Sequence, residues 1–188
     1  MFYQTIPLRY LTLNPNYKKL EDLQATHFSL GLKYQNDLET TITLEAYHKA
    51  YDNLLIDPYN PQILVSQLAV DSYFYPGALT NAGKGWARGI ELMIRQRLLN
   101  QFFGLFNLSL FRCKYRDYLG IERNSVYDNR YILNLTFGYR PSARWELSLR
   151  YTLIGGGPHP PFDLERTRQY QTLVYDLSRF NADRYPDF

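Results

Sequence analysis

The chain has 188 residues, and several features that identify common protein classes are scarce or missing in it. It contains one cysteine, which excludes an internal disulfide framework. No stretch approaches the roughly 18 apolar residues that a membrane-spanning helix requires, so a helical membrane protein is excluded. The net charge is only +3 and the charges are interspersed, which argues against a nucleic-acid partner.

What the chain does have is strict alternation between residues 130 and 153. Two runs there each place apolar side chains on one face of an extended chain and polar side chains on the other. The apolar positions are Tyr131, Leu133, Leu135, Phe137, Tyr139 and, in the second run, Trp145, Leu147, Leu149, Tyr151, Leu153. Pro141, Ser142 and Ala143 interrupt the alternation, because proline fixes φ and donates no ladder hydrogen bond. The stretch therefore predicts a β-hairpin.

The chemistry of the two faces indicates a membrane. Each run has about the ten residues that a tilted strand needs to cross the hydrocarbon of a bilayer. Leucines in the middle, aromatic residues towards both ends and a polar opposite face are typical of a transmembrane barrel strand. The 18 tyrosines fit interfacial belts. A mean hydropathy of −0.40 is compatible with a barrel, because inward-facing polar residues offset lipid-facing ones. A soluble sheet with one buried face also alternates, so the hairpin alone leaves that alternative open.

Four earlier runs with the same period bring the prediction to six long strands. The expected strands are residues 24–35, 40–51, 88–98, 103–115, 130–140 and 144–154. Short turns near residues 36, 100 and 142 alternate with the long segments 52–87, 116–129 and 155–188. All long segments then emerge on one side of the sheet, as in outer-membrane barrels and unlike a Greek-key sandwich. The sequence predicts an all-β fold, an antiparallel up-and-down meander that is part of a transmembrane β-barrel.

Three stretches carry a family resemblance. The first stretch is Asn81, Ala82 and Gly83 followed by residues 88–92, at the start of an expected strand. The second stretch is Asn14, Pro15 and Asn16 followed by residues 26–34, in which a glycine precedes a leucine, a lysine and a tyrosine. The third stretch is residues 43–55. In this order they resemble the late barrel strands of TonB-dependent outer-membrane receptors, over about residues 10–154.

The resemblance implies a ligand-gated receptor in the outer membrane of a Gram-negative bacterium. Such a receptor takes up a scarce nutrient, such as a ferric siderophore, cobalamin, haem or an oligosaccharide. Its implied partners are outer-membrane lipid, the small-molecule ligand, and the TonB energising complex, which acts through an N-terminal region.

This sequence departs from the family pattern at both ends. It shows no plug domain and no final barrel strand, and residues 1–7 contain no signal peptide. We therefore expect residues 1–188 to be a partial barrel domain, a fragment of a receptor.

No pattern predicts catalysis, a cofactor or a metal. Glu45, Glu91 and Glu146 fall on the polar faces of the expected strands, where charge inside a barrel is ordinary. The three histidines lie on separate elements without ligand spacing. We expect a protein that is not an enzyme and that has no cofactor.

Aromatic and basic residues of the expected outer loops are the candidates for ligand contact. Aromatic rings could stack on a sugar or an aromatic siderophore, and arginines could pair with anionic groups. The candidates are Tyr73, Phe74, Tyr75, Trp86, Tyr118, Arg88, Arg116 and Arg123. Packing between neighbouring loops explains the same aromatic residues, so the sequence alone assigns no binding site.

A soluble antiparallel β-sheet binding module, carbohydrate-binding or structural, is the alternative function. Its apolar faces would pack on a second layer instead of lipid. The two hypotheses predict opposite responses to a charge on the leucine face, where Leu149→Arg would cost about 2–4 kcal/mol if that face meets lipid. Ser148→Arg, on the other face, should be tolerated in a wide lumen but not in a packed sandwich.

Overall fold

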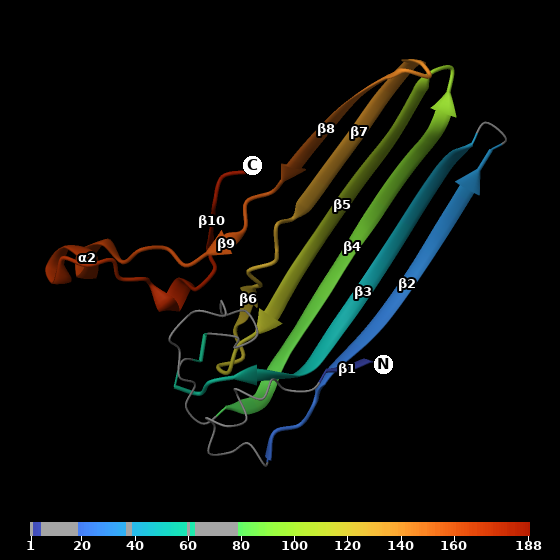
Figure 1. Cartoon of the computed structure of the whole chain (residues 1–188). Helices are drawn as coiled ribbons and strands as arrows, with labels where there is room; N and C mark the ends of the chain where they lie inside the picture. The colour runs from blue at the N-terminus through green and yellow to red at the C-terminus, as the bar shows by residue number, and fades with distance from the viewer. Residues whose placement is uncertain (1, 5–18, 37–38, 60, 63–78) are drawn as a thin grey trace.

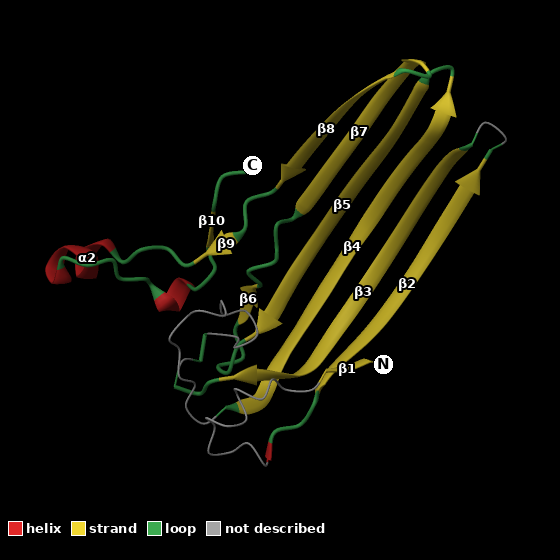
Figure 2. Ribbon diagram, in the orientation of Figure 1, coloured by secondary structure: helices red, strands yellow, loops and turns green. Residues whose placement is uncertain are grey.

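The computed structural model describes residues 2–4, 19–36, 39–59, 61–62 and 79–188. Six long strands dominate this part of the chain (Figure 2). They are β2 (Leu23–Gln35), β3 (Thr40–Ile56), β4 (Thr80–Leu99), β5 (Phe102–Arg116), β7 (Tyr131–Ser142) and β8 (Trp145–Ile154). Two short strands join the sheet: β1 (Phe2–Gln4) pairs with the start of β2, and β6 (Glu122–Asn124) pairs with the end of β5.

The long strands form one antiparallel sheet in chain order (Figure 1). Each is hydrogen-bonded to the next long strand, so the order across the sheet is β2, β3, β4, β5, β7, β8. The strand ends that lead into the three short connections lie together at one end of the sheet, and the strand ends that lead into the long segments lie at the other. The antiparallel up-and-down meander expected from the sequence is therefore confirmed.

The short connections follow from local turn chemistry. Leu99 pairs with Phe102, and Asn100 and Gln101 between them have φ values of 47° and 75°. Positive φ at both central positions defines a type I′ turn, whose twist suits a hairpin. The expectation that Pro141 ends its strand is wrong, because β7 continues to Ser142. Its register with β8 shifts between Tyr139 and Ser142, so Pro141 lies in a bulge, where no ladder donor is needed.

The expected long segment 52–87 is wrong at both ends, since β3 continues to Ile56 and β4 begins at Thr80. Prolines and the lack of a sustained period suggested a loop there, yet Gly83 is a strand residue packed closely against β3. A Cβ atom added at Gly83 would lie 2.7 Å from the carbonyl oxygen of Leu54. Glycine within a strand often marks such a close backbone approach.

The other two long segments also contain structure. Residues 116–129 include β6, and residues 155–188 include β9 (Pro158–His159), α2 (Leu164–Tyr170), a 3-10 helix (Leu177–Arg179) and β10 (Asp183–Arg184). The side chain of Asp163 caps α2 by accepting from the N–H of Arg166 at 3.0 Å. In the described ranges, no helix has both the length and the apolar character needed to cross a membrane.

Strand register gathers the apolar residues into continuous rows on one face, here called the apolar face. One row crosses all six long strands, and the next row does the same. The first consists of Leu32, Leu44, Leu92, Leu108, Leu133 and Leu153, and the second of Tyr34, Ile42, Ile94, Phe106, Leu135 and Tyr151. Many of these side chains are exposed, and neighbours on the same face reach 77% for Leu30 and 65% for Leu149.

The buried core is small and lies at the long-segment end. One cluster joins Leu54, Ile56 and Tyr115, and a second joins Leu55 and Leu79. A water-soluble domain buries most of its strand leucines. Here the leucine rows lie outside the core, and an exposed apolar patch of this extent marks an interaction surface.

Candidate functional site

Charged residues gather at the long-segment end of the sheet, on the continuation of the apolar face. On β3, β4 and β5, the next three rows beyond Ile90 and Leu110 carry mostly polar and charged side chains, while Phe28 of β2 pairs with His48 in the first of them. We call them the basic rows. They contain His48, Arg88, Arg112; then Ala50, Trp86, Lys114, Asn124; then Asp52, Lys84, Arg116, Glu122.

Trp86 is the centre of the contacts in the basic rows. The guanidinium carbon of Arg88 lies 4.5 Å from the centroid of the Trp86 ring, within cation–π range. The indole Nε1–H of Trp86 donates to Glu122 Oε2 at 3.1 Å. Lys114 Nζ donates to Glu122 Oε1 at 2.8 Å. The hydrogen bond from Lys114, and then that from Trp86, hold the pKa of the Glu122 carboxyl below its usual range.

An open hollow of about 1040 Å³ follows the basic rows. Its cationic lining residues are Lys84, Arg88, Arg112, Lys114, Arg130 and Arg184, and its acidic lining residues are Asp52 and Glu122. One of the acidic groups is engaged with Lys84, whose Nζ lies 3.3 Å from Asp52 Oδ1. The hollow therefore has an excess of positive charge and favours an anionic group.

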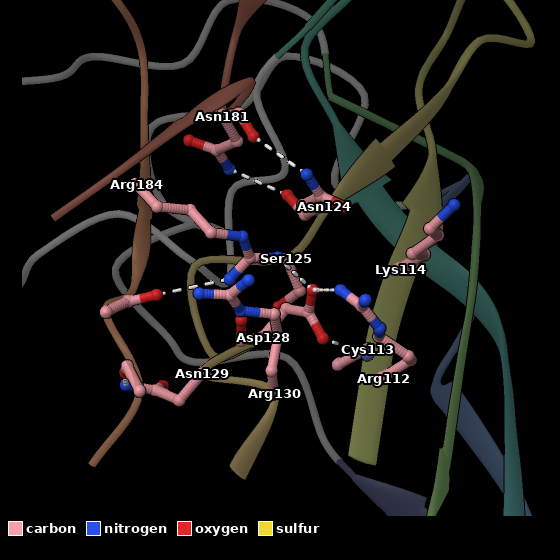
Figure 3. A network of polar contacts seen from close by, with 12 residues as sticks. Arg112, Cys113, Lys114, Asn124, Ser125, Asp128, Asn129, Arg130, Asn181 and Arg184 are labelled. Atoms are coloured by element: carbon pink, nitrogen blue, oxygen red, sulfur yellow. Dashed lines mark hydrogen bonds and ion pairs between the residues drawn. The ribbon is translucent and has the colours of Figure 1, made fainter. Parts of the chain in front are cut away.

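A buried carboxylate fastens the C-terminal segment beside this hollow (Figure 3). Asp128 is 0% exposed, and its Oδ1 accepts from the backbone N–H of Cys113 at 2.8 Å. Its Oδ2 lies 3.5 Å from Arg112 Nη1 and also pairs with Arg184 of β10. Asn124 and Asn181 exchange two hydrogen bonds, each from a side-chain amide to the other residue's carbonyl, at 3.0 and 2.9 Å.

A second buried pair supports the same region. Arg123 Nε donates to Asp117 Oδ2 at 2.7 Å, and both side chains are almost fully buried. Arg123 Nη1 also donates to the carbonyl oxygen of Ser178 at 3.0 Å. These contacts hold the 3-10 helix against β6, so Arg123 serves the structure here.

The structure separates the candidates for ligand contact that the sequence suggested. Trp86, Arg88 and Arg116 lie in the basic rows, on the same side of the sheet as the leucines. Arg123 is buried against Asp117, and Tyr118 is a half-exposed loop residue whose N–H donates to Pro61. Tyr73, Phe74 and Tyr75 lie outside the described residues. The described candidates therefore do not converge on one site on the polar face.

Sequence reasoning missed Lys84, Arg112 and Lys114 as members of the basic rows. Lys84 fell within the expected loop, so its position relative to Ile90 was not counted. Continuing the period of two backwards from Ile90 places Arg88, Trp86 and Lys84 on the apolar face. Extending the alternation in this way could have identified these residues from the sequence.

The opposite, polar face carries its own cluster at this level. His27 and Tyr47 make an edge-to-face contact with ring centroids 6.2 Å apart, and Lys49 Nζ lies 5.1 Å from the Tyr47 ring centroid. One row further along, Glu45 of β3 lies directly opposite Glu91 of β4. Among the residues that the structure describes, no group of three or more His, Cys, Asp or Glu side chains could hold a metal ion.

Comparison with known families gives one result that covers almost the whole chain. The sequence model of a family described as "TonB dependent receptor-like, beta-barrel" matches residues 3–186. Comparison with curated proteins and with solved structures gives no match.

Proposed function

The chain belongs to the TonB-dependent receptor-like β-barrel family, and we propose that it forms six consecutive strands of a receptor that takes up a scarce nutrient across the outer membrane. The family is one of outer-membrane receptors and transporters of Gram-negative bacteria, and the sheet is part of a transmembrane β-barrel. The finer elements of the proposal are the kind of ligand and the source of energy.

The unbroken leucine row across the six strands is the observation that carries this proposal. It places Leu44, Leu92 and Leu108 side by side on a face that the described structure leaves outside its core. The apolar positions of β5 run from Phe102 to Leu110, close to the 9–11 residues that a tilted strand needs to span hydrocarbon. Lipid covers such a face without a second protein layer.

The strand edges support the same proposal. In the described part of the chain, β2 beyond Ala25 and β8 before Ile154 each have a long-strand neighbour on one side only. Lipid cannot satisfy the hydrogen bonds of an open edge. We therefore propose that further strands pair with both edges and close the barrel.

Closure of the barrel would turn the polar face towards its lumen. His27, Tyr47, Lys49 and Glu91 would then line the wall of the conduit near its outer end, where hydrogen-bonding and charged groups could guide a polar ligand. The long segments at that end would receive the ligand first. An iron chelate, cobalamin, haem or oligosaccharide is the proposed class, and the TonB complex is the proposed energy source.

Uptake measurements test the proposal. Cells with and without the gene would be given labelled ferric siderophores, cobalamin, haem or oligosaccharides, each with and without a protonophore. We expect deletion to abolish uptake of one ligand class, and the protonophore to abolish the same uptake in wild-type cells. Loss of no ligand, or uptake that persists with the protonophore, contradicts the proposal.

A further inference from the structure

We infer that the C-terminal segment consists of a part that stays fastened to the sheet throughout uptake and a part that is free to move. The fastened part, here called the docked base, is residues 155–159 and 177–188. The movable part, here called the arm, is residues 160–176 between them. The division rests on the proposed function, because it concerns the passage of a nutrient through the outer mouth of the barrel, and it adds which residues there stay fixed.

The first half of the docked base is held through its backbone. The Gly155 N–H donates to the carbonyl oxygen of Tyr131 at 3.0 Å, and the Gly155 carbonyl oxygen accepts from the side-chain amide of Asn129 at 2.7 Å. The Gly156 N–H donates to the Asp187 carboxylate at 2.9 Å. A Cβ atom added at Gly155 would lie 2.0 Å from the carbonyl oxygen of Asn129, so the two backbones are in close contact.

The second half of the docked base is held at three points along its length, two of which Figure 3 shows. The contacts join Ser178 to Arg123, Asn181 to Asn124, and Arg184 to Asp128. Arg123, Asp128 and Asn181 are all buried, with Asp128 0% and Asn181 1% exposed. These contacts therefore lie inside the fold, where water does not compete for the same donors and acceptors.

The two halves of the docked base are also fastened to each other. β9 pairs with β10, and the Tyr185 N–H donates to the carbonyl oxygen of Gly157 at 3.0 Å. The His159 and Tyr185 rings lie with their centroids 4.3 Å apart. Phe188 and Ile154 exchange two backbone hydrogen bonds, at 3.0 and 2.6 Å. Opening of the base must break contacts at all of these points together, which makes it a rarer event than a local opening.

The arm has a different set of contacts. Among the residues that the structure describes, no hydrogen bond or ion pair joins the arm to the sheet, and α2 has no buried residue. Its backbone hydrogen bonds close within the arm, as from the Asp163 N–H to the carbonyl oxygen of Val174 at 2.8 Å. Leu164 and Tyr170 are 64% and 63% exposed. Figure 1 shows α2 apart from the sheet.

This difference confines movement to the arm. Surface segments that move are those with few buried contacts, and only the arm meets that condition here. A ligand shifts a segment between two positions by as much as its contacts with the two positions differ. To open the docked base, a ligand would have to offset every contact described above, whereas the arm can shift without breaking one of them.

Cross-linking the docked base to the neighbouring outer segment tests this division. Gly157→Cys and Val126→Cys are introduced together in a Cys113→Ser background, in cells that produce the whole receptor. A Cβ atom added at Gly157 would lie 3.6 Å from the carbonyl oxygen of Val126, an ordinary contact, so the substitution fits. Dibromobimane joins the two thiols, and its fluorescence reports how far the reaction has gone. Uptake of labelled ferric siderophore, cobalamin, haem and oligosaccharide is measured with and without the reagent.

We expect the cross-linked cells to show no loss of uptake, because the docked base does not have to open. The matched control is Gly157→Cys alone with the same reagent, which modifies one thiol and forms no bridge. Loss of uptake in the double variant but not in this control would show that the base opens, and would overturn the inference.

Hydrogen exchange of the wild-type protein decides if the double variant does not reach the outer membrane. The amides of Gly155, Tyr185 and Phe188 should exchange equally slowly with and without the probe that the cells take up. Faster exchange of these amides with the probe would overturn the inference. Failure of the proposed function has a separate sign, since wild-type cells would then take up none of the four probes.

Discussion

At the scale of single residues, neighbours in one strand face different surroundings. Leu149 and Ser148 are consecutive in β8, opposite Phe137 and Gly138 of β7 respectively. Leu149 therefore belongs to the apolar face and Ser148 to the polar face. In a membrane-spanning barrel, the first side chain meets lipid and the second meets water.

A charge introduced at these two positions should have different costs. We expect Leu149→Arg to reduce the free energy of unfolding in lipid vesicles by about 2–4 kcal/mol, because an arginine would meet hydrocarbon. Ser148→Arg should change it by less than about 0.5 kcal/mol, as is usual for exposed sites. Urea titration of the folded protein in vesicles measures both values, and equal costs would contradict the assignment of the two faces.

Asp187 gives a residue-scale prediction about pH. Its Oδ2 accepts from the Tyr131 hydroxyl at 2.5 Å and its Oδ1 from the Gly156 N–H at 2.9 Å. The Tyr131 hydrogen bond, and then the Gly156 hydrogen bond, hold the pKa of the Asp187 carboxyl below its usual range. The contact thus stabilises the docked C-terminus above the ordinary aspartate pKa of about 3.9, and this contribution is lost as the pH falls through the lowered folded-state pKa.

Carbon NMR titration of the Asp187 carboxyl should therefore give a pKa below about 3.9. Tyr131→Phe should return the pKa towards the ordinary value, because the hydroxyl that donates to the carboxylate is removed. A wild-type pKa at or above the ordinary value would show that the tail does not dock through this carboxylate.

At the scale of elements, the C-terminal segment 155–188 is tied to the rest of the fold by hydrogen bonds and ion pairs at separate points. The edge of β8 meets it where Phe188 N–H donates to Ile154 O at 3.0 Å. Asp128 provides the strongest link, since it joins Arg112 of β5 to Arg184 of β10. Loss of this carboxylate should release the segment and leave the sheet intact.

Asp128→Asn should weaken docking of the segment by about 3 kcal/mol, because the buried pair with Arg184 loses its negative partner. Hydrogen exchange should then increase in residues 155–188 and stay unchanged in the paired strands. The matched control is Asp176→Asn, an exposed N-cap that asparagine replaces well. Equal exchange in the two variants would show that Asp128 does not fasten the segment.

The sequence predicted most elements but not all of their limits. A period of two is a local property, so the runs around Leu92, Leu108 and Leu149 identified strands and the face that each presents. The start of β4 was missed because Gly83 is needed there for the close approach of Leu54 on the neighbouring strand. A pattern along the sequence does not show which residue of another strand lies beside it. The turn at Asn100 was found because its chemistry is local.

The candidate site was predicted less well, for a related reason. Trp86 and Arg88 were recognised as residues able to bind a ligand, but the face of Trp86 depended on the missed strand boundary. Arg123 was chosen for its charge, whereas its partner Asp117 and the carbonyl of Ser178 come from segments brought together only by folding.

At the scale of the whole molecule, the sheet has two unlike ends and two unlike faces. The strand ends that lead into short turns lie at one end, and those that lead into long segments lie at the other (Figure 1). The apolar face ends at Ile90 and Leu110, and the basic rows begin beyond it towards the long segments. For the proposed barrel, we therefore expect the long-segment end to project outside the cell and the turns to face the periplasm.

Labelling of single cysteines in intact cells would show whether these strands cross the outer membrane. In a Cys113→Ser background, Tyr118→Cys places a thiol in the half-exposed loop at the long-segment end, and Ala143→Cys places one in the turn between β7 and β8. A bulky membrane-impermeant maleimide should label the first variant in intact cells and the second only after the outer membrane is permeabilised. Equal labelling of both variants in intact cells, or of neither until the cells are broken, would contradict a strand pair that crosses the outer membrane.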